Sequence, residues 1–198
     1  MTFDQFKLLA LVFFTFSSSL AAEEIERNFL SGHDFELSHT TKQTEFTVSI
    51  ADGVSDGCWL GASRSKSLIE RELLDAGYTN ILDKRVLGHL IAVDVVGYET
   101  VSARCAINLT FKLSVVDQDS RRRANVDWIS LNYSDTISYS VLMTSPKTSM
   151  TERINDEISS FTDKLLVDIQ QAKNAVLREI SESDASEAAK EYLSIMIE

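Results

Sequence analysis

Alternation of apolar and polar residues is clearest in the middle of the chain, where it predicts long β-strands. From residue 101 to residue 115 every odd position is apolar and most even positions are polar. The preceding segment 87–95 alternates in the same way, and residues 97–100 can turn between the two segments. A period of two sustained over this length is typical of strands with one buried and one solvated face, which favours an antiparallel sheet.

Further strands are predicted on both sides of this pair. Residues 46–50 alternate over a short stretch, and a loop rich in glycine and aspartate follows at 51–63. A turn is expected at 117–123, where three arginines indicate either a polyanion site or the solvated tip of a hairpin, and the acidic chain favours the tip. Residues 126–141 predict a third long strand, with a shift of register near 134–135.

A first helix is predicted after the glycine-rich loop. Ser67 and Glu70 have the spacing of a capping box, with Ser63 and Ser65 as rival caps. Gly77 follows the last predicted turn and provides a C-terminal stop.

A second, much longer helix is predicted beyond Pro146, where Ser149 and Glu152 form another candidate capping box. Its length exceeds that of a typical strand, so its distal half is expected to project beyond the sheet. Residues 181–186 interrupt the helical pattern, and residues 187–197 can form another short helix. The apolar positions of the long helix recur every three or four residues, at Met150, Ile154, Ile158, Phe161, Leu165, Ile169, Ala172, Val176 and Ile180.

Together these elements predict an α+β fold. An antiparallel sheet of three to four strands is packed on one face by two helices, in the order α-β-β-β-α with a long C-terminal helix. The predicted organisation is a signal peptide at 1–21, a loosely packed polar leader at 22–44, one α+β domain at 45–180 and an acidic helical tail at 181–198.

The N-terminal segment predicts export. Lys7 precedes an apolar run at 8–16, and small residues place a cleavage site between Ala21 and Ala22. The run is short for a membrane span, although an uncleaved N-terminal anchor is the alternative. No cysteine lies at the cleavage site for lipid attachment. We therefore expect a periplasmic or secreted protein without stable membrane insertion after cleavage.

The two cysteines, Cys58 and Cys105, are predicted to form a disulfide in an oxidising compartment. Two reduced buried thiols are the alternative, and a catalytic thiol is the weaker one. The three histidines, His33, His39 and His89, are scattered and do not complete a metal site. His89 falls on the core-facing register of its strand, where we expect a half-buried imidazole with satisfied hydrogen bonds. No metal and no cofactor are expected.

Charge narrows the choice of partners. The 198 residues contain 30 Asp and Glu against 19 Lys and Arg, a net charge of −11. The charge is −6 over residues 22–57, +1 over 58–150 and −6 over 151–198, so it lies at the two ends. This balance argues against a nucleic-acid partner and against an anionic membrane surface.

The chain carries no phosphate-binding loop, zinc-protease motif or serine-hydrolase motif, so no catalytic residues are predicted. Pairs of acids such as Glu70 and Glu72 do not indicate a catalytic site, because such pairs occur throughout so acidic a chain. Asn108 and Asn132 lie in glycosylation sequons that matter only in a eukaryotic source.

Several short motifs resemble those of small exported bacterial proteins. They are LIERELLDAGY on the first helix, LIAVDV and INLTFKLSVV on two strands, VDW on the next strand and ISSFTDKLL on the long helix. In architecture the pattern is similar to periplasmic auxiliary and envelope-assembly proteins with a small sheet backed by two helices. These motifs are packing features, and fold analogy does not carry function.

Two functions are consistent with these observations. The first is an exported non-catalytic protein that binds another envelope protein as a binding or assembly factor. The second is a small-ligand carrier or hydrolase with a pocket between sheet and helices. A flat apolar patch on residues 165–196 would favour the first, and a deep cleft ringed by polar side chains would favour the second.

Overall fold

The computed structural model describes residues 37–83, 88–100, 103–123 and 126–197, with backbone alone at 117–123 and 126–133. The predicted signal segment and the Ala21–Ala22 cleavage site lie outside these residues. The elements in chain order are β1 (Phe46–Val54), α3 (Ala62–Asp75), β2 (Ile81–Leu82), β3 (Gly88–Glu99), β4 (Arg104–Arg123), β5 (Val126–Pro146), α4 (Lys147–Glu182) and α5 (Glu187–Ile197).

The α+β class and the long helix near the C-terminus are confirmed, but the predicted sheet is wrong in two respects. The observed sheet has five strands in the order β2-β1-β3-β4-β5, and it contains both parallel and antiparallel pairs. β1 runs parallel to both β2 and β3, whereas β3, β4 and β5 are antiparallel neighbours. The reason is that α3 follows β1 and returns the chain to the end of the sheet where β1 began, so that β2 and β3, which come next, run in the same direction as β1.

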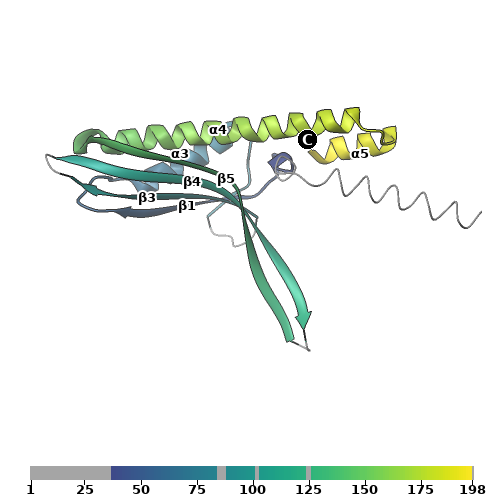
Figure 1. The fold of residues 1–198 in the computed structure, drawn as a ribbon, viewed down its shortest axis with the longest axis horizontal. Coiled ribbons are helices and arrows are strands. Elements are labelled where there is room, and N and C mark those ends of the chain that lie inside the picture. Colours follow the sequence, from purple (N-terminus) through teal and green to yellow (C-terminus); the bar gives the residue numbers. More distant parts are fainter. Residues whose placement is uncertain (1–36, 84–87, 101–102, 124–125, 198) are drawn as a thin grey trace, which may run out of the picture.

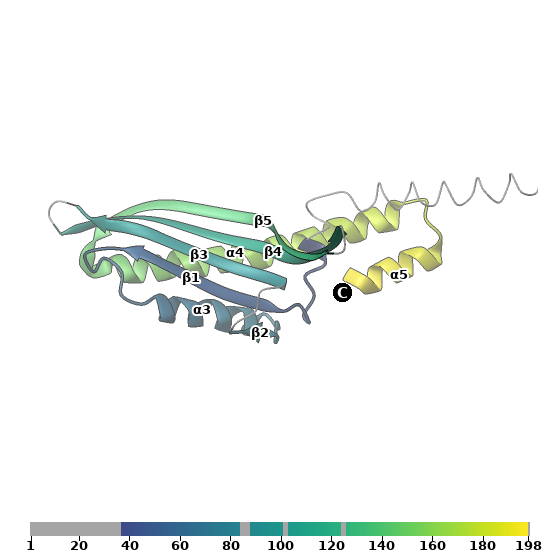
Figure 2. The ribbon, with the colours of Figure 1, turned by 90° about the horizontal axis from the view of Figure 1, so that it is seen from below.

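Both long helices lie on one face of the sheet (Figures 1 and 2). We call the opposite, uncovered face of the sheet the open face. The covered face carries the odd positions of β3 and β4, where the apolar side chains from 91 to 95 and from 105 to 113 are completely buried, while even positions such as Asp94, Val96 and Asn108 are exposed. The predicted alternation is therefore confirmed from 91 to 95 and from 105 to 113, whereas Ala103 is exposed and Val115 is only partly buried. The fully buried members are Ile91, Val93, Val95, Cys105, Ile107, Leu109, Phe111 and Leu113. The turn predicted at 97–100 is wrong for residues 97–99, which belong to β3.

The apolar stripe of α4 covers this core. The buried residues of α4 match the predicted stripe, except that Thr162 is buried and Phe161 is only partly buried. Tyr139 of β5 lies under the helix, where its hydroxyl donates a hydrogen bond of 2.5 Å to the Asp168 carboxylate. Burial and this carboxylate raise the pKa of Tyr139.

The turn predicted at 117–123 is wrong, because β4 continues to Arg123 and pairs with β5 along its whole length. The distal part of this hairpin bends away from the sheet on the side opposite the helices (Figure 1). The predicted shift of register is confirmed, since Leu113 pairs with Ile137 and Ser114 with Asp135. Thr136 is thus the extra residue of a β-bulge, which increases local twist and bending.

Both predicted capping boxes are wrong. α3 begins after Gly61 and α4 after Pro146, and neither has a side-chain cap hydrogen bond. Gly77 is confirmed as the stop of α3, with a φ of 91°. The N–H groups of Gly77 and Tyr78 bond to the carbonyls of Leu74 and Leu73, the pattern of a Schellman motif.

Part of the predicted loose leader is packed. In the described residues before β1, Leu37, Ser38 and Thr40 are buried, and Leu37 belongs to the main core. The polar composition of this segment concealed its contact with the sheet.

Gly97 of β3 marks a close approach between two strands. A Cβ at this position would overlap the carbonyl oxygen of Ala106 and the Cδ1 atom of Ile107. We expect Gly97→Ala to lower the free energy of unfolding by about 1–3 kcal/mol, because the strands must separate. Gly53→Ala is the matched control in β1, where the nearest atom is a valine methyl at 3.3 Å. Equal urea midpoints for the two variants would contradict this.

Candidate functional site

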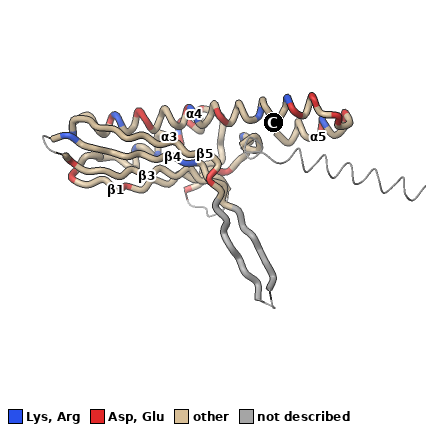
Figure 3. Tube along the Cα trace, viewed as in Figure 1, with Lys and Arg blue, Asp and Glu red and all other residues tan. Residues whose placement is uncertain are grey.

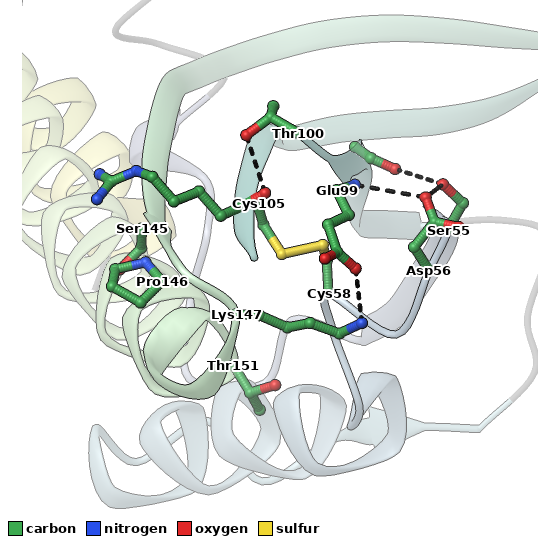
Figure 4. Close-up of a disulfide and its surroundings, with 12 residues drawn as sticks. Ser55, Asp56, Cys58, Glu99, Thr100, Cys105, Ser145, Pro146, Lys147 and Thr151 are labelled. Atoms are coloured by element: carbon green, nitrogen blue, oxygen red, sulfur yellow. Dashed lines mark hydrogen bonds and ion pairs between the residues drawn. A yellow bond between two sulfur atoms is a disulfide. The ribbon is translucent and has the colours of Figure 1, made fainter. Parts of the chain in front are cut away.

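The first candidate region is the end of the sheet that holds the disulfide, which we call the disulfide end. Cys58, in the loop before α3, and Cys105, in β4, form the predicted disulfide, with Cα atoms 5.8 Å apart (Figure 4). Both cysteines are completely buried. Lys147, at the start of α4, pairs with Glu99 of β3 at 2.8 Å. These links tie the loop, two strands and the start of α4 together, so this pair of cysteines is structural.

Hydrogen bonds that begin at the disulfide end also fix the relative orientation of α3 and α4. The Leu60 N–H donates to Thr151 Oγ1 at 3.2 Å, and Ser65 Oγ donates to Asn155 Oδ1 at 2.6 Å. Successive residues of the α3 region thus contact successive turns of α4, so the two helices run side by side in the same direction. Ser159 of α4 continues this contact by donating to the Glu72 carboxylate. Sequence reasoning dismissed Glu72, and no local signal could have revealed this partner.

His89 is half-buried, as predicted, and contacts the packed leader. Its Nε2 lies 3.4 Å from Thr40 Oγ1, and its ring lies 5.5 Å from the ring of Phe46. Burial lowers the pKa of His89. The imidazole packs the leader on the sheet, and this geometry gives it no catalytic partner among the described residues.

This burial makes stability depend on pH with a definite sign. The unfolded chain binds a proton at His89 near the ordinary pKa of 6.5, whereas the folded chain binds it only at lower pH. The contribution is therefore complete above that value and is lost as the pH falls below it. We expect His89→Gln to reduce the loss of stability between neutral and mildly acidic pH, measured by urea unfolding. An unchanged pH slope would contradict this.

An open groove lies between α3 and α4, with a volume of about 740 Å³. Arg64 and Arg71 line one wall, and Glu152 and Asp156 line the other. All four charged residues are solvent-exposed. The groove is therefore open to solvent, and it is lined almost entirely by polar side chains with both signs of charge.

A second surface lies beyond the sheet, where α5 folds back along the distal part of α4 (Figure 2). We call this the helical tip, residues 173–197. The break and the short helix predicted there are confirmed. Val176, Ile180 and Ile197 form a small separate core, with Leu177 and Leu193 packed against it. The tip is thus held together by its own contacts.

The outer face of α5 is also apolar. Tyr192, Ile195 and Met196 are 64, 67 and 45% exposed. Their spacing of three to four residues places them on one side of the helix. Acidic residues gather around the turn between α4 and α5 (Figure 3), at Glu179, Glu182, Asp184, Glu187 and Glu191. The helical tip therefore combines an exposed apolar stripe with an acidic border.

The other residues singled out from the sequence are not brought together. Asn108 is exposed on the open face of the sheet, and the side chains of Asn132 and of the arginines at 121–123 lie outside the described part. Glu70 pairs with Lys66 along α3 at 3.4 Å. No group of three metal-ligating side chains occurs among the residues that the structure describes. Within the same residues, no helix combines the length and apolar character needed to cross a membrane.

Comparison with known proteins adds no evidence on the role of these surfaces. The sequence matches no protein-family model and no curated protein.

Proposed function

We propose that this chain is an exported, non-catalytic binding protein of the cell envelope that contacts another envelope protein through its helical tip. The observation that carries the proposal is the exposed apolar stripe of Tyr192, Ile195 and Met196. A helix that is apolar on two sides, one packed on α4 and one facing solvent, is typical of an element with a further partner. The stripe lies within residues 165–196, the segment in which we expected an apolar patch if the protein binds a partner.

The border of the stripe indicates the chemistry of that partner. The helical tip contains five acids and three bases, and one of the bases, Lys190, is paired with Glu187 at 3.4 Å. The surrounding acids favour an apolar surface edged by lysine or arginine, because complementary charges steer association and exclude wrong partners. Export is supported by the buried disulfide, since disulfides persist in oxidising compartments.

Site-specific photo-cross-linking in the exporting host tests this proposal. A photoreactive residue at Ile195 should yield a defined adduct with an envelope protein, and the same residue at Leu60 should not. Leu60 is 75% exposed and lies at the disulfide end, so it controls for exposure alone. Tyr192→Glu should abolish the adduct, and added salt should weaken it. Absence of an adduct at 195, or the same adduct at both positions, would contradict the proposal.

The alternative function is a small-ligand carrier that uses the groove between α3 and α4. The exposed arginines Arg64 and Arg71, on the wall opposite Glu152 and Asp156, favour a ligand with both signs of charge. Native mass spectrometry of the purified protein tests it. This function would be favoured over the first if a small molecule is bound by the wild type and lost in Arg71→Ala, and if the helical tip yields no cross-linked adduct.

A further inference from the structure

The outer edge of β5 is a second surface without a partner strand in the described structure. β5 is the last strand of the sheet. Arg153 of α4 donates a hydrogen bond of 3.0 Å to the Thr144 carbonyl, so the peptide groups of Thr144 point away from β4. Peptide groups alternate along an antiparallel strand. Those of Ser138, Ser140 and Leu142 therefore also point outward.

This edge lacks the usual protection. Edge strands in natural sheets are commonly interrupted by charged residues, prolines or bulges that prevent pairing with another strand. Residues 137–145 contain no charged residue and no proline. Ser138, Ser140 and Leu142 are exposed, Leu142 by 76%. The unprotected stretch is limited by the bulge at Thr136 on one side and by the Arg153 contact at Thr144 on the other.

We propose that a second copy of this chain pairs with this edge, in a dimer built on two antiparallel β5 strands. Ser140 is the midpoint of the free stretch between Thr136 and Thr144. A twofold axis at Ser140 therefore lets the whole stretch of one copy pair with the whole stretch of the other. A twofold axis at Ser140 places its peptide groups opposite those of Ser140 in the second copy. The same axis places Ser138 opposite Leu142 in both directions. Each of these pairs exchanges two hydrogen bonds, which uses all the outward peptide groups of the three residues.

The side chains fit the same axis. On the helix-covered face, Tyr139 would lie opposite Val141, and Ile137 opposite Met143. Ile137 and Val141 are only partly buried at the margin of the core, and the second strand would cover them. On the open face the small serines permit close approach and Leu142 gains a neighbour. Residues 137–145 carry no charge of their own, so no like charges of the two strands oppose each other across the pair. This self-complementarity favours a second copy over an unrelated strand.

Two substitutions in the mature chain test the dimer by sedimentation equilibrium over a range of concentrations. Ser140→Pro removes an outward N–H, a position where an edge strand accepts proline. Leu142→Lys places a charge on the edge. Each should weaken dimerisation by about tenfold or more, since two symmetry-related contacts are lost. Val96→Lys, also on the open face but in an interior strand, should leave the dimer intact.

A covalent readout keeps the test independent of folding losses. Ser140→Cys should form a disulfide between the two copies on mild oxidation, because the axis brings the two residues together. Val96→Cys should remain uncoupled. A monomeric wild type overturns the proposal and leaves the edge to an extended segment of another protein. A dimer that survives both edge substitutions and does not cross-link at residue 140 overturns it as well.

Discussion

Replacing both cysteines, as Cys58→Ala with Cys105→Ala, should lower the free energy of unfolding by about 4 kcal/mol. The bond closes a loop with a sequence separation of 47 residues, and the value follows from the entropy that such a loop removes from the unfolded chain. Alanine keeps the buried positions apolar, so the loss reports mainly on the covalent link. Urea unfolding of the oxidised wild type and the double variant measures it.

Reduced wild type is the matched control. With the disulfide cleaved and the thiols kept reduced, it should unfold at a urea concentration close to that of the double variant. Mass measurement after alkylation without reductant should show no labelled cysteine in the folded protein. A stability loss below about 1 kcal/mol, well under the typical range for a native disulfide, would contradict the structural role. So would alkylation of both residues before reduction.

Removing the ring of Phe111 should have a comparable effect. Phe111 is completely buried in the covered face of β4, with its ring centre 6.0 Å from that of Tyr139 and 6.2 Å from that of Phe161. The latter two rings are 5.4 Å apart, so the three form one cluster between sheet and α4. Phe111→Ala should cost about 3–5 kcal/mol, through lost burial and the cavity left behind.

Asn108→Ala provides the comparison on the same strand. Asn108 points to the open face, where a substitution should change the free energy of unfolding by about 0.5 kcal/mol or less. Phe111→Leu should fall between the two, because it retains part of the buried volume. If Phe111→Ala and Asn108→Ala unfold at the same urea concentration, the assignment of the two faces of β4 is wrong.

The sequence predicted the faces of the strands because burial itself imposes the alternation. The odd positions from Ile91 to Val95 and from Cys105 to Leu113 are buried as a direct result of that pattern. It did not predict strand order or direction, since the pairing of β1 with β3 depends on the crossover through α3. For the same reason the exposed edge of β5 could not be predicted. A strand becomes an edge through topology, and its own residues do not record it.

Helix starts were missed for a different reason. The capping-box pattern at Ser149 assumes a cap by a side chain, whereas α4 begins earlier, directly after Pro146. Ser149 lies inside the helix and donates to the Pro146 carbonyl at 3.2 Å. At the helical tip, by contrast, the sequence itself indicates the exposed apolar surface. Residues 192–196 carry a second apolar side of α5, which distinguishes it from an ordinary amphipathic helix.

The separate core of the helical tip divides the stability of α4 into two parts. Residues up to Ala172 pack in the main core, whereas Val176 and Ile180 contact only the small cluster with α5. Amide hydrogens of α5 and the last turns of α4 should therefore exchange through local opening, at a lower free energy than the amides of the sheet. A protein that binds α5 would slow exchange at the tip and leave the protection of the sheet unchanged. Recognition at this end would then be set by a local equilibrium, independent of the disulfide that stabilises the opposite end.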